Sequence, residues 1–517
     1  MLPDFIGRRF MPSSLIPVRR WRRPMLVALM ALTLGACAVG PDFQSPADKL
    51  AEDYQVRAPV GETARTDGPG GGAQRFTEGA PIAADWYRLF GSPALDALIR
   101  QAMENSPSLR ASQASLRQAA HQLEAVSGSD LPDLDLSGGA TRQRSNGARI
   151  GQDNPMFNNV FNLYEARLAL SYDLDLFHAS DRETEAQVAQ VAYAQNLLRG
   201  SMLTLVDNVV VTTVRLAALR DRLAASETIV RLQRDQAELL SEQEQAGSVA
   251  YADVLRARAQ LADSQAQLPT LRHDLATTEH ALARLVGADP STFRAPPLSL
   301  ADLNLPAELP VSLPSELVRQ RPDILAAEEQ LHAANARVGL ATARLYPNLN
   351  LTASLGSVAN HGDALFEPAA KVWSLGADLT APLFHGGTLR ANKKAAQAAW
   401  EAEYAHYRDT VLGAFVQVAD VLDAIQRDAD GLNARDHSLE ANRDSLALVR
   451  KQYRAGAAGY LDVLSAEQRY NQALLSRIDA VRQRYVNTAA LYHALGGGWW
   501  SATPERNDRT AAAPTAP

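Results

Sequence analysis

Apolar residues that recur every seven positions mark the longest stretches of the chain. Two such series are Val254, Leu261, Leu268, Leu275 and Leu282, and Ile425, Leu432, Leu439, Leu446 and Tyr453. A strict repeat of seven over several turns predicts helices that supercoil around one another. The neighbouring stretches 181–246 and 388–455 contain no proline. At 1.5 Å per residue each is long enough for a helix of roughly 100 Å.

Two shorter stretches alternate between apolar and polar positions. Their apolar positions are Tyr164, Ala166, Leu168, Leu170 and Tyr172 in one, and Trp373, Leu375, Ala377, Leu379 and Ala381 in the other. About ten residues with one apolar face fit a strand that crosses a bilayer at a tilt. A strand on a soluble core alternates in the same way, but the rest of the chain offers little globular mass for such a core. An earlier strand in each half is predicted around Leu134 and Leu349.

A short turn motif occurs twice without a gap. Residues 246–255 read AGSVAYADVL and residues 455–464 read AGAAGYLDVL. Each copy predicts the tip of a helical hairpin. Gly247 and Gly456 are placed to end the incoming helix in the left-handed conformation that glycine adopts cheaply. Asp253 and Asp462 fall in the first turn of the outgoing helix, where the macrodipole favours a carboxylate.

These paired patterns predict one architecture built from two similar halves. In order, the chain is divided into a signal peptide (1–36), a lipid-anchored extended segment (37–85), a first repeat (86–288), a linker (289–312), a second repeat (313–500) and a disordered tail (501–517). Each repeat is expected to hold a helix, two strands and a long hairpin, and the first helix is expected over about 93–127. The hairpin tips are placed near 247–251 and 456–460.

The amino-terminal residues have the composition of a bacterial secretion signal. Basic residues at 19–23 precede a short apolar run and then small residues before Cys37. The apolar run is too short to span a membrane. Residues 34–37, Leu-Gly-Ala-Cys, resemble a lipobox, which implies that Cys37 is acylated and becomes the mature amino terminus. An ordinary signal peptide that contains a cysteine is the alternative. Ala38 stands where the usual inner-membrane retention signal has Asp.

Composition argues against several other functions. A net charge of −7 with 21% charged residues gives no basic surface for nucleic acid. A single Cys excludes an internal disulfide or a cysteine-rich metal site. No His-Glu-x-x-His motif and no Ser/His/Asp set stands out, so we expect no enzyme, no metal and no cofactor besides the covalent lipid. His178 and His385 occupy equivalent positions and are expected at strand-to-helix corners.

The number of strands bears on how the chain is used. Two strands per half give four per chain, whereas about eight is the smallest membrane barrel. An open sheet edge cannot face lipid because its backbone groups would lack hydrogen bonds. We therefore expect three chains to share twelve strands and to gather twelve long helices into a tube. The predicted fold class is an α+β membrane protein with a trimeric 12-stranded outer-membrane β-barrel, continued by a periplasmic coiled-coil helical barrel.

Several short motifs, in order, resemble one family. They are the lipobox followed by Val39–Phe43, the twin Gly-x-x-x-Tyr-x-Asp-Val-Leu tips, Leu176–His178 with Leu383–Gly387, and Leu495–Trp499. Together they resemble TolC-like outer membrane factors of tripartite efflux systems, in the OprM/NodT lipoprotein group. The resemblance implies a homotrimeric duct in the bacterial outer membrane that exports drugs or other small toxic compounds. It also implies a periplasmic adaptor (membrane fusion protein) and an inner-membrane pump, commonly of the resistance-nodulation-division type.

Within this resemblance the tips are the candidate gate and docking site. The gate candidates are Tyr251, Asp253, Tyr460, Leu461, Asp462 and Ser465, and the adaptor-docking candidates are Gly247, Ser248, Gly456 and Gly459. Three-fold symmetry turns each inward residue into a ring that binds cations or excludes water. The alternative is that the two aspartates only stabilise helix starts. Ser465 stands where related channels often carry an acidic residue, so this gate is expected to be built differently.

Two other functions stay open at this point. The same fold would serve as a duct for type I protein secretion or for metal efflux, although no Met-rich cluster favours a soft metal. A lipid-anchored periplasmic coiled-coil scaffold without a barrel is an alternative of a different class. It leaves the amphipathic strands unexplained.

Overall fold

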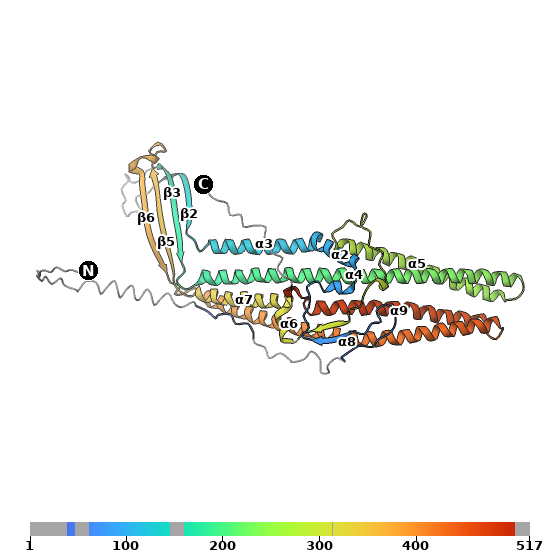
Figure 1. Cartoon of the computed structure of the whole chain (residues 1–517). Coiled ribbons are helices and arrows are strands. Elements are labelled where there is room, and N and C mark those ends of the chain that lie inside the picture. The colour runs from blue at the N-terminus through green and yellow to red at the C-terminus, as the bar shows by residue number, and fades with distance from the viewer. Residues whose placement is uncertain (1–38, 47–60, 145–159, 313, 502–517) are drawn as a thin grey trace, which may run out of the picture. The chain divides into compact units, whose positions relative to one another are not determined.

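A computed structural model describes residues 39–46, 61–144, 160–312 and 314–501 (Figure 1). The chain divides into two compact units, each assembled from segments that are far apart in sequence. Of the described residues, the first unit comprises 39–43, 125–144, 160–186 and 335–398, and the second comprises 44–46, 61–124, 187–312, 314–334 and 399–501. Both halves of the duplicated sequence contribute to both units.

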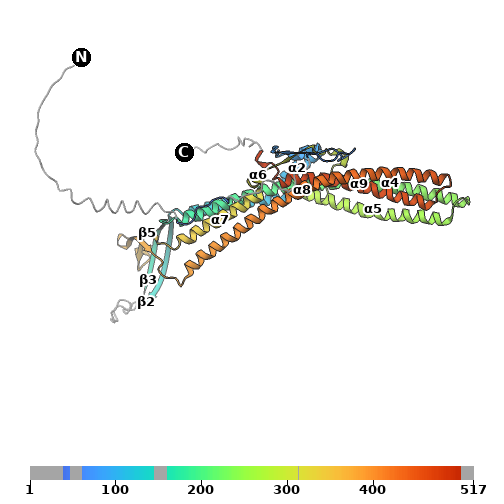
Figure 2. The ribbon, with the colours of Figure 1, turned by 90° about the horizontal axis from the view of Figure 1, so that it is seen from below.

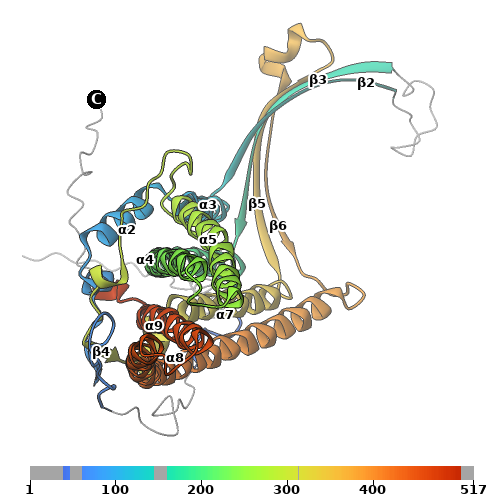
Figure 3. The ribbon, with the colours of Figure 1, turned by 90° about the vertical axis from the view of Figure 1, so that its right-hand side faces the viewer.

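The first unit contains a four-stranded antiparallel sheet. Its strands are β2 (Asp133–Arg144), β3 (Val160–Leu174), β5 (Asn348–Ala359) and β6 (Lys371–Thr380). They lie side by side in the order β2-β3-β5-β6, as Figure 3 shows. Within the described residues, the outer edges of β2 and β6 have no strand partner. All four strands were predicted from the sequence, two in each half.

The register of the sheet separates an apolar face from a polar face. Leu136, Leu168, Leu355 and Trp373 form one row across the four strands, and the outer two are 80% and 77% exposed. On the opposite face Asp173, Asn350 and Asp378 share a row. There the Asn350 side-chain amide donates to the Asp173 carboxylate at 2.6 Å. The predicted alternation is confirmed, and large apolar side chains lie exposed along one surface of the sheet.

Two long hairpins form most of the second unit. One is made of α4 (Ala179–Gln245) and α5 (Tyr251–Leu285), and the other of α8 (Thr388–Arg454) and α9 (Tyr460–Ala494). They lie side by side in Figure 2. Among the described helices only α4 has a window long and apolar enough to cross a membrane, and half of that window is buried in the chain's own packing. A helix packed in the core of a protein passes the same test of length and composition.

Each half begins with two helices rather than the single one predicted. In the first half α2 (Pro93–Asn105) and α3 (Pro107–Gly128) are separated at Ser106, whose ψ of 123° is not helical. A residue that precedes proline is pushed out of the α region by the proline ring. The second half repeats this arrangement, with α6 (Pro314–Gln320) and α7 (Pro322–Ala343) separated at Arg321. The prediction of one helix over 93–127 missed this break.

Parts of the predicted extended segment (37–85) and of the predicted linker (289–312) are folded within the second unit. β1 (Arg75–Glu78) pairs in parallel with β4 (Glu308–Val311), which lies inside the expected linker. Arg484 of α9 is 1% exposed and donates to the carbonyl oxygens of Gly70 at 2.6 Å and Gly72 at 3.0 Å. A guanidinium offers five donors, which suits a turn of free carbonyls. Residues 61–78 therefore form a strap on α9, and the ordered body begins well before Trp86.

An aromatic cluster lies beneath this strap. The 3-10 helix Trp86–Phe90 packs on α9, where the rings of Trp86 and Tyr492 stack with centroids 5.0 Å apart. The Tyr485 hydroxyl donates to the carbonyl oxygen of Leu303 at 2.7 Å. Burial raises the pKa of Tyr485 to about 12. These contacts hold residues 86–90 and the linker backbone at Leu303 against α9.

Candidate functional site at the hairpin tips

The two hairpins turn where the sequence predicts. Gly247 has φ +77° and Gly456 has φ +73°, so both adopt the left-handed conformation. In the first turn the Ser248 backbone N–H donates to the Gln243 carbonyl at 2.8 Å, and the Ser248 hydroxyl donates to the same oxygen at 2.8 Å. Bonds of this kind satisfy the last carbonyls of the incoming helix. A side chain built at Gly247 or Gly456 would meet nothing within 4 Å among the described residues, so both turns present open backbone.

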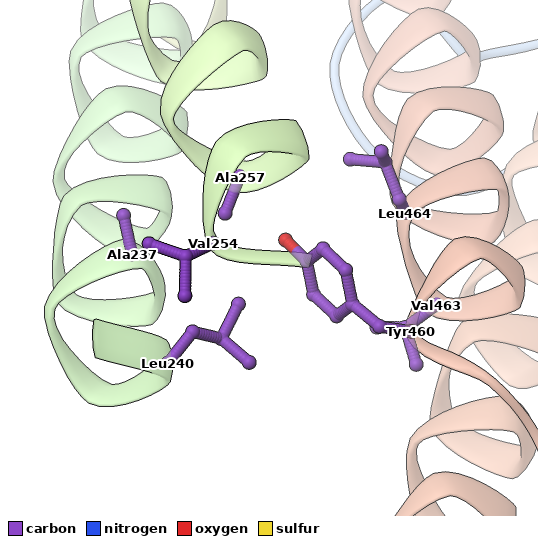
Figure 4. Close-up of a cluster of buried hydrophobic side chains, with 7 residues drawn as sticks. All are labelled: Ala237, Leu240, Val254, Ala257, Tyr460, Val463 and Leu464. Carbon is purple, nitrogen blue, oxygen red and sulfur yellow. The ribbon is translucent and has the colours of Figure 1, made fainter. Parts of the chain in front are cut away.

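The equivalent tyrosines have different surroundings. Tyr251 is 57% exposed, whereas Tyr460 is 4% exposed. Tyr460 projects from α9 toward Val254 and Ala257 of α5, as Figure 4 shows. It belongs to a buried cluster that joins the two hairpins, made of Ala237, Leu240, Val254, Ala257, Tyr460, Val463 and Leu464. We call this group the tip cluster. It packs α4 and α5 against the start of α9.

Burial also sets the ionisation of the tip cluster tyrosine. It raises the pKa of Tyr460 to about 12, with smaller contributions from the nearby charges of Glu467 and Asp253. The Tyr453 ring lies edge-on to it, with centroids 6.2 Å apart, and burial raises the pKa of Tyr453 as well. Both phenols are therefore neutral near pH 7. The charge of Asp253, on the first hairpin, acts on tyrosines of the second hairpin.

The two tip carboxylates make different contacts. Asp253 forms an ion pair with Arg256 at 2.6 Å. Asp462 accepts a hydrogen bond from the Gly459 backbone N–H at 2.9 Å. Ser465, which occupies the position equivalent to Arg256, donates instead to the Leu461 carbonyl at 2.8 Å. Asp462 therefore caps the start of α9, whereas Asp253 in the first tip is paired with a cation.

The remaining predicted tip residues lie on the surface. Leu461 is 56% exposed. Gly459 has φ −84°, an ordinary extended conformation, so its place is not dictated by left-handed backbone. The structure brings Asp253, Tyr460 and Asp462 to the same end of the second unit, because both turns lie there. Whether these residues gate a passage or dock an adaptor stays a prediction.

Sequence reasoning missed a partly buried ion pair near the tips. Arg450 of α8 donates to Glu467 of α9 at 2.7 Å, and the Glu467 side chain is 10% exposed. It fixes the two helices of the second hairpin to each other. Arg258 stands at the equivalent position of the first half. A basic residue in one copy thus stands where the other copy has an acidic one. This difference between otherwise similar copies was the signal that the sequence offered.

The residues that follow Cys37 are bound to the first unit, although Cys37 itself lies outside the described residues. The Asp42 carboxylate pairs with Arg182 at 2.7 Å, and Asn335 donates to the Pro41 carbonyl at 3.0 Å. Gly40 has φ +115°, and a side chain there would meet the Cα of Gly339 at 2.5 Å. These contacts explain the role of the Val39–Phe43 motif in the fold. Its glycine permits close approach and its aspartate holds a buried arginine.

A sheet with an uncovered apolar face and long paired hairpins defines a class of membrane channel subunits with a helical extension. A family model described as outer membrane efflux protein matches residues 98–288 and 313–497. The chain is 30% identical to outer membrane protein OprJ of Pseudomonas aeruginosa over 91% of this chain and 95% of that protein. It is 32% identical to pyoverdine export outer membrane protein OpmQ of Pseudomonas putida, over 81% of this chain and 89% of that one.

A solved structure agrees with these relatives. The outer-membrane channel OprN matches with a TM-score of 0.79 and 27% identity, over 90% of this chain and 100% of that chain. The chain belongs to the outer membrane efflux protein family. It is an exit channel of the bacterial outer membrane, and the predicted fold class, family, function and outer-membrane location are confirmed. The lipid anchor on Cys37 stays a prediction. This is a family of transport proteins.

Proposed function

We propose that three copies of this chain form the outer-membrane exit duct of a tripartite pump for small toxic compounds. The observation that carries this proposal is the four-stranded sheet, which has an exposed apolar face and, within the described part of the chain, two edges without a partner. Backbone groups at an open edge are costly in hydrocarbon. Pairing the β2 edge of one copy with the β6 edge of the next removes both edges, and three copies supply twelve strands.

The tips are the proposed point of contact with the pump. Each copy presents Gly247, Ser248, Gly456 and Gly459 in two exposed turns. Open backbone without side chains lets another helical hairpin approach closely. We propose that a periplasmic adaptor docks here and that an inner-membrane pump of the resistance-nodulation-division type lies beyond it. The names of relatives cite antibiotic, toluene and pyoverdine as cargo. Such different cargoes on one fold favour selection by the pump rather than by this chain.

The proposed gate uses the same end of the second unit. Tyr251, Asp253, Leu461, Asp462 and Ser465 would form rings around the three-fold axis, and Tyr460 would hold the hairpins together behind them. Rings of carboxylate attract cations, and rings of leucine exclude water. The tip cluster supports this proposal because it joins the first hairpin to the second, so the closed arrangement depends on contacts that an adaptor would have to separate.

Lipid on Cys37 is the proposed anchor. The motif directly after it is held by Asp42, Arg182 and Asn335 in the unit that contains the sheet. An acyl chain on Cys37, only a few residues before Pro41, would start close to that unit, where the membrane-facing strands are. The lipid would thus add to the membrane contact that we propose for the sheet.

The deciding experiment is the mass of the particle that mild detergent extracts from outer membranes, followed by conductance in a planar bilayer. A trimer that conducts ions is the expected result. A monomer released by cleaving the lipid would overturn the duct and favour the periplasmic scaffold. Mass spectrometry of the mature amino terminus, with Cys37→Ser as control, tests the lipid separately.

A further inference from the structure

Two corners of the first unit share a motif but differ in their surroundings. The sequence Leu-Phe-His follows strand β3 and occurs again after strand β6. In the first corner the Phe177 ring stacks on the Tyr346 ring, with centroids 4.8 Å apart. In the second corner Leu383 is 94% exposed and Phe384 is 88% exposed. A single copy of the chain therefore packs one of these phenylalanines and leaves the other almost bare.

The duplication identifies the position that should cover Phe384. Tyr346 and Pro347 lead into β5 in the same way as Leu131 and Pro132 lead into β2, and the two pairs are 215 positions apart. The residue equivalent to Tyr346 is therefore Leu131, which is 66% exposed. Both members of the second, equivalent contact are thus apolar and exposed.

Leu131 and Phe384 cannot meet within one chain. Leu131 precedes β2 and Phe384 follows β6, and these are the outer strands of the sheet (Figure 3). Neighbouring strands lie about 4.8 Å apart, so the outer pair is separated by about 14 Å. The two residues become neighbours when the β6 edge of one copy joins the β2 edge of the next. Such a junction is equivalent to the β3–β5 pairing inside the chain, where Phe177 meets Tyr346.

The register of this junction follows from the same equivalences. Within the chain, Ser171 of β3 lies opposite Thr352 of β5. Their equivalents are Asp378 of β6 and Ser137 of β2, so these two residues are expected to face each other across the junction. Slipping the register by one residue would bring the apolar face of one sheet beside the polar face of the next. The derived register instead continues each face from copy to copy, as a closed barrel requires.

The first corner is also held by hydrogen bonds that the second corner lacks. The Asp175 carboxylate accepts from the backbone N–H groups of Ala179 and Ser180, both at 2.7 Å. Pro382 occupies the equivalent position in the second corner, and its side chain has no acceptor. Contact with another copy would therefore give the second corner a support that its own sequence does not supply.

We propose that Phe384 of one copy packs on Leu131 and Pro132 of the next copy, at the end of a β6–β2 junction in which Asp378 lies opposite Ser137. This proposal rests on the proposed trimer and adds the residues and the register that join its copies. An exposed apolar corner would also suit the membrane interface. The packing of the equivalent phenylalanine on the residue before a paired strand favours the second copy as the occupant.

Disulfide trapping in the purified full-length protein tests the register. Opposed residues of antiparallel strands have Cα atoms about 4.5–5.5 Å apart, which a disulfide can span, whereas diagonal neighbours are about 7–8 Å apart. We expect Asp378→Cys combined with Ser137→Cys to give linked dimers and trimers on a denaturing gel after oxidation. Asp378→Cys with Asp135→Cys is the control shifted by two residues in one direction. Ser137→Cys with Thr380→Cys is the control shifted in the other direction. Both controls are expected to link far less, and the single substitutions account for any contribution from Cys37.

A double-mutant cycle tests the contact at the corner. Phe384→Ser and Leu131→Ser should each lower the temperature at which the trimer dissociates, because either change removes apolar contact between copies. Combining them should add little to the larger single effect, since residues that touch are not additive. Phe366 is 84% exposed in the same unit, and Phe366→Ser serves as the matched control that leaves dissociation unchanged. Full additivity would overturn the contact.

The outcomes separate this proposal from the proposed duct. A protein that stays monomeric in detergent contradicts the duct and the junction together. A trimer that links through one of the shifted pairs keeps the duct and overturns the register. If Phe384→Ser weakens binding to lipid vesicles but leaves trimer dissociation unchanged, the corner meets the membrane interface and the contact between copies is overturned.

Discussion

At the scale of single residues, duplication makes equivalent positions comparable within one chain. Asp253 and Asp462 derive from the same motif, yet one is paired with Arg256 and the other accepts from the backbone N–H of Gly459. Tyr251 is exposed and Tyr460 is buried. The copies diverge because only the second hairpin places its tyrosine in the tip cluster. Similar sequence at the two tips therefore does not mean similar surroundings.

Two substitutions at Asp462 distinguish capping from gating. Asp462→Ala removes both the charge and the hydrogen bond to Gly459, so we expect a cost of about 1 kcal/mol at the start of α9 and a rise in single-channel conductance. Asp462→Asn keeps an acceptor but removes the charge. If conductance depends on charge, Asn behaves like Ala. If the carboxylate only caps the helix, Asn restores the wild-type value.

The buried phenol of Tyr460 predicts a loss of stability in alkali. Its folded pKa of about 12 lies above the ordinary value of 10.0, so the folded state holds the proton more tightly than the unfolded state. This contribution is complete below about pH 10 and is lost as the pH rises toward about 12. Thermal unfolding followed from about pH 9 to about pH 11.5 should show a steeper loss in wild type than in Tyr460→Phe. Parallel curves would contradict the assigned burial, and Tyr251→Phe is the exposed control.

At the scale of elements, the periodic patterns correctly predicted those helices whose bounds depend on residues close together in the sequence. The bounds predicted for the two long helices, 181–246 and 388–455, agree closely with α4 and α8. Proline-free repeats and a terminal glycine are local signals. The strap over 61–78 was not predicted because its structure depends on Arg484, which lies 414 positions from Gly70 in the chain. The break before Pro107 was a local signal that the helical periodicity on both sides outweighed.

The same reasoning separates the parts of the candidate site. The turns and the capping carboxylate followed from the motif, since glycine and aspartate act within one turn of helix. The tip cluster and the Arg450–Glu467 pair required knowing which helices lie side by side. A seven-residue repeat tells that a helix packs, but it does not identify its neighbour. Those features became visible only with the hairpins placed against each other.

Removal of Arg484 should release the strap. Arg484→Leu leaves the carbonyls of Gly70 and Gly72 without their donor, and leaving a buried acceptor unpaired costs about 1–3 kcal/mol. We expect trypsin to cut after Arg65 or Arg75 in the variant while wild type resists. Arg482→Leu, two residues away and partly exposed, is the matched control. Equal resistance of all three proteins would show that the strap is held by β1 and β4 alone.

At the scale of the whole molecule, the sheet decides how the chain meets the membrane. Its two faces differ within a single strand. Leu375 is 79% exposed in the apolar rows, whereas the neighbouring Ser374 shares a hydrogen bond of 2.8 Å with Ser354 on the polar face. If three copies close a barrel, the apolar face contacts lipid and the polar face lines the passage. If instead both faces of the sheet met water, an added charge would have the same effect on either face.

Lysine at these two neighbouring positions tests that assignment. Leu375→Lys places a charge on the lipid face, which costs about 2–4 kcal/mol near the bilayer midplane, whereas lumen positions tolerate charge. We therefore expect Leu375→Lys to lower the yield of trimer in the outer membrane fraction, judged by heat-modifiable migration in a gel. Ser374→Lys should assemble normally and change ion selectivity toward anions. Equal assembly of both variants would contradict lipid contact on the Leu375 face, and the opposite order would reverse the assignment of the two faces.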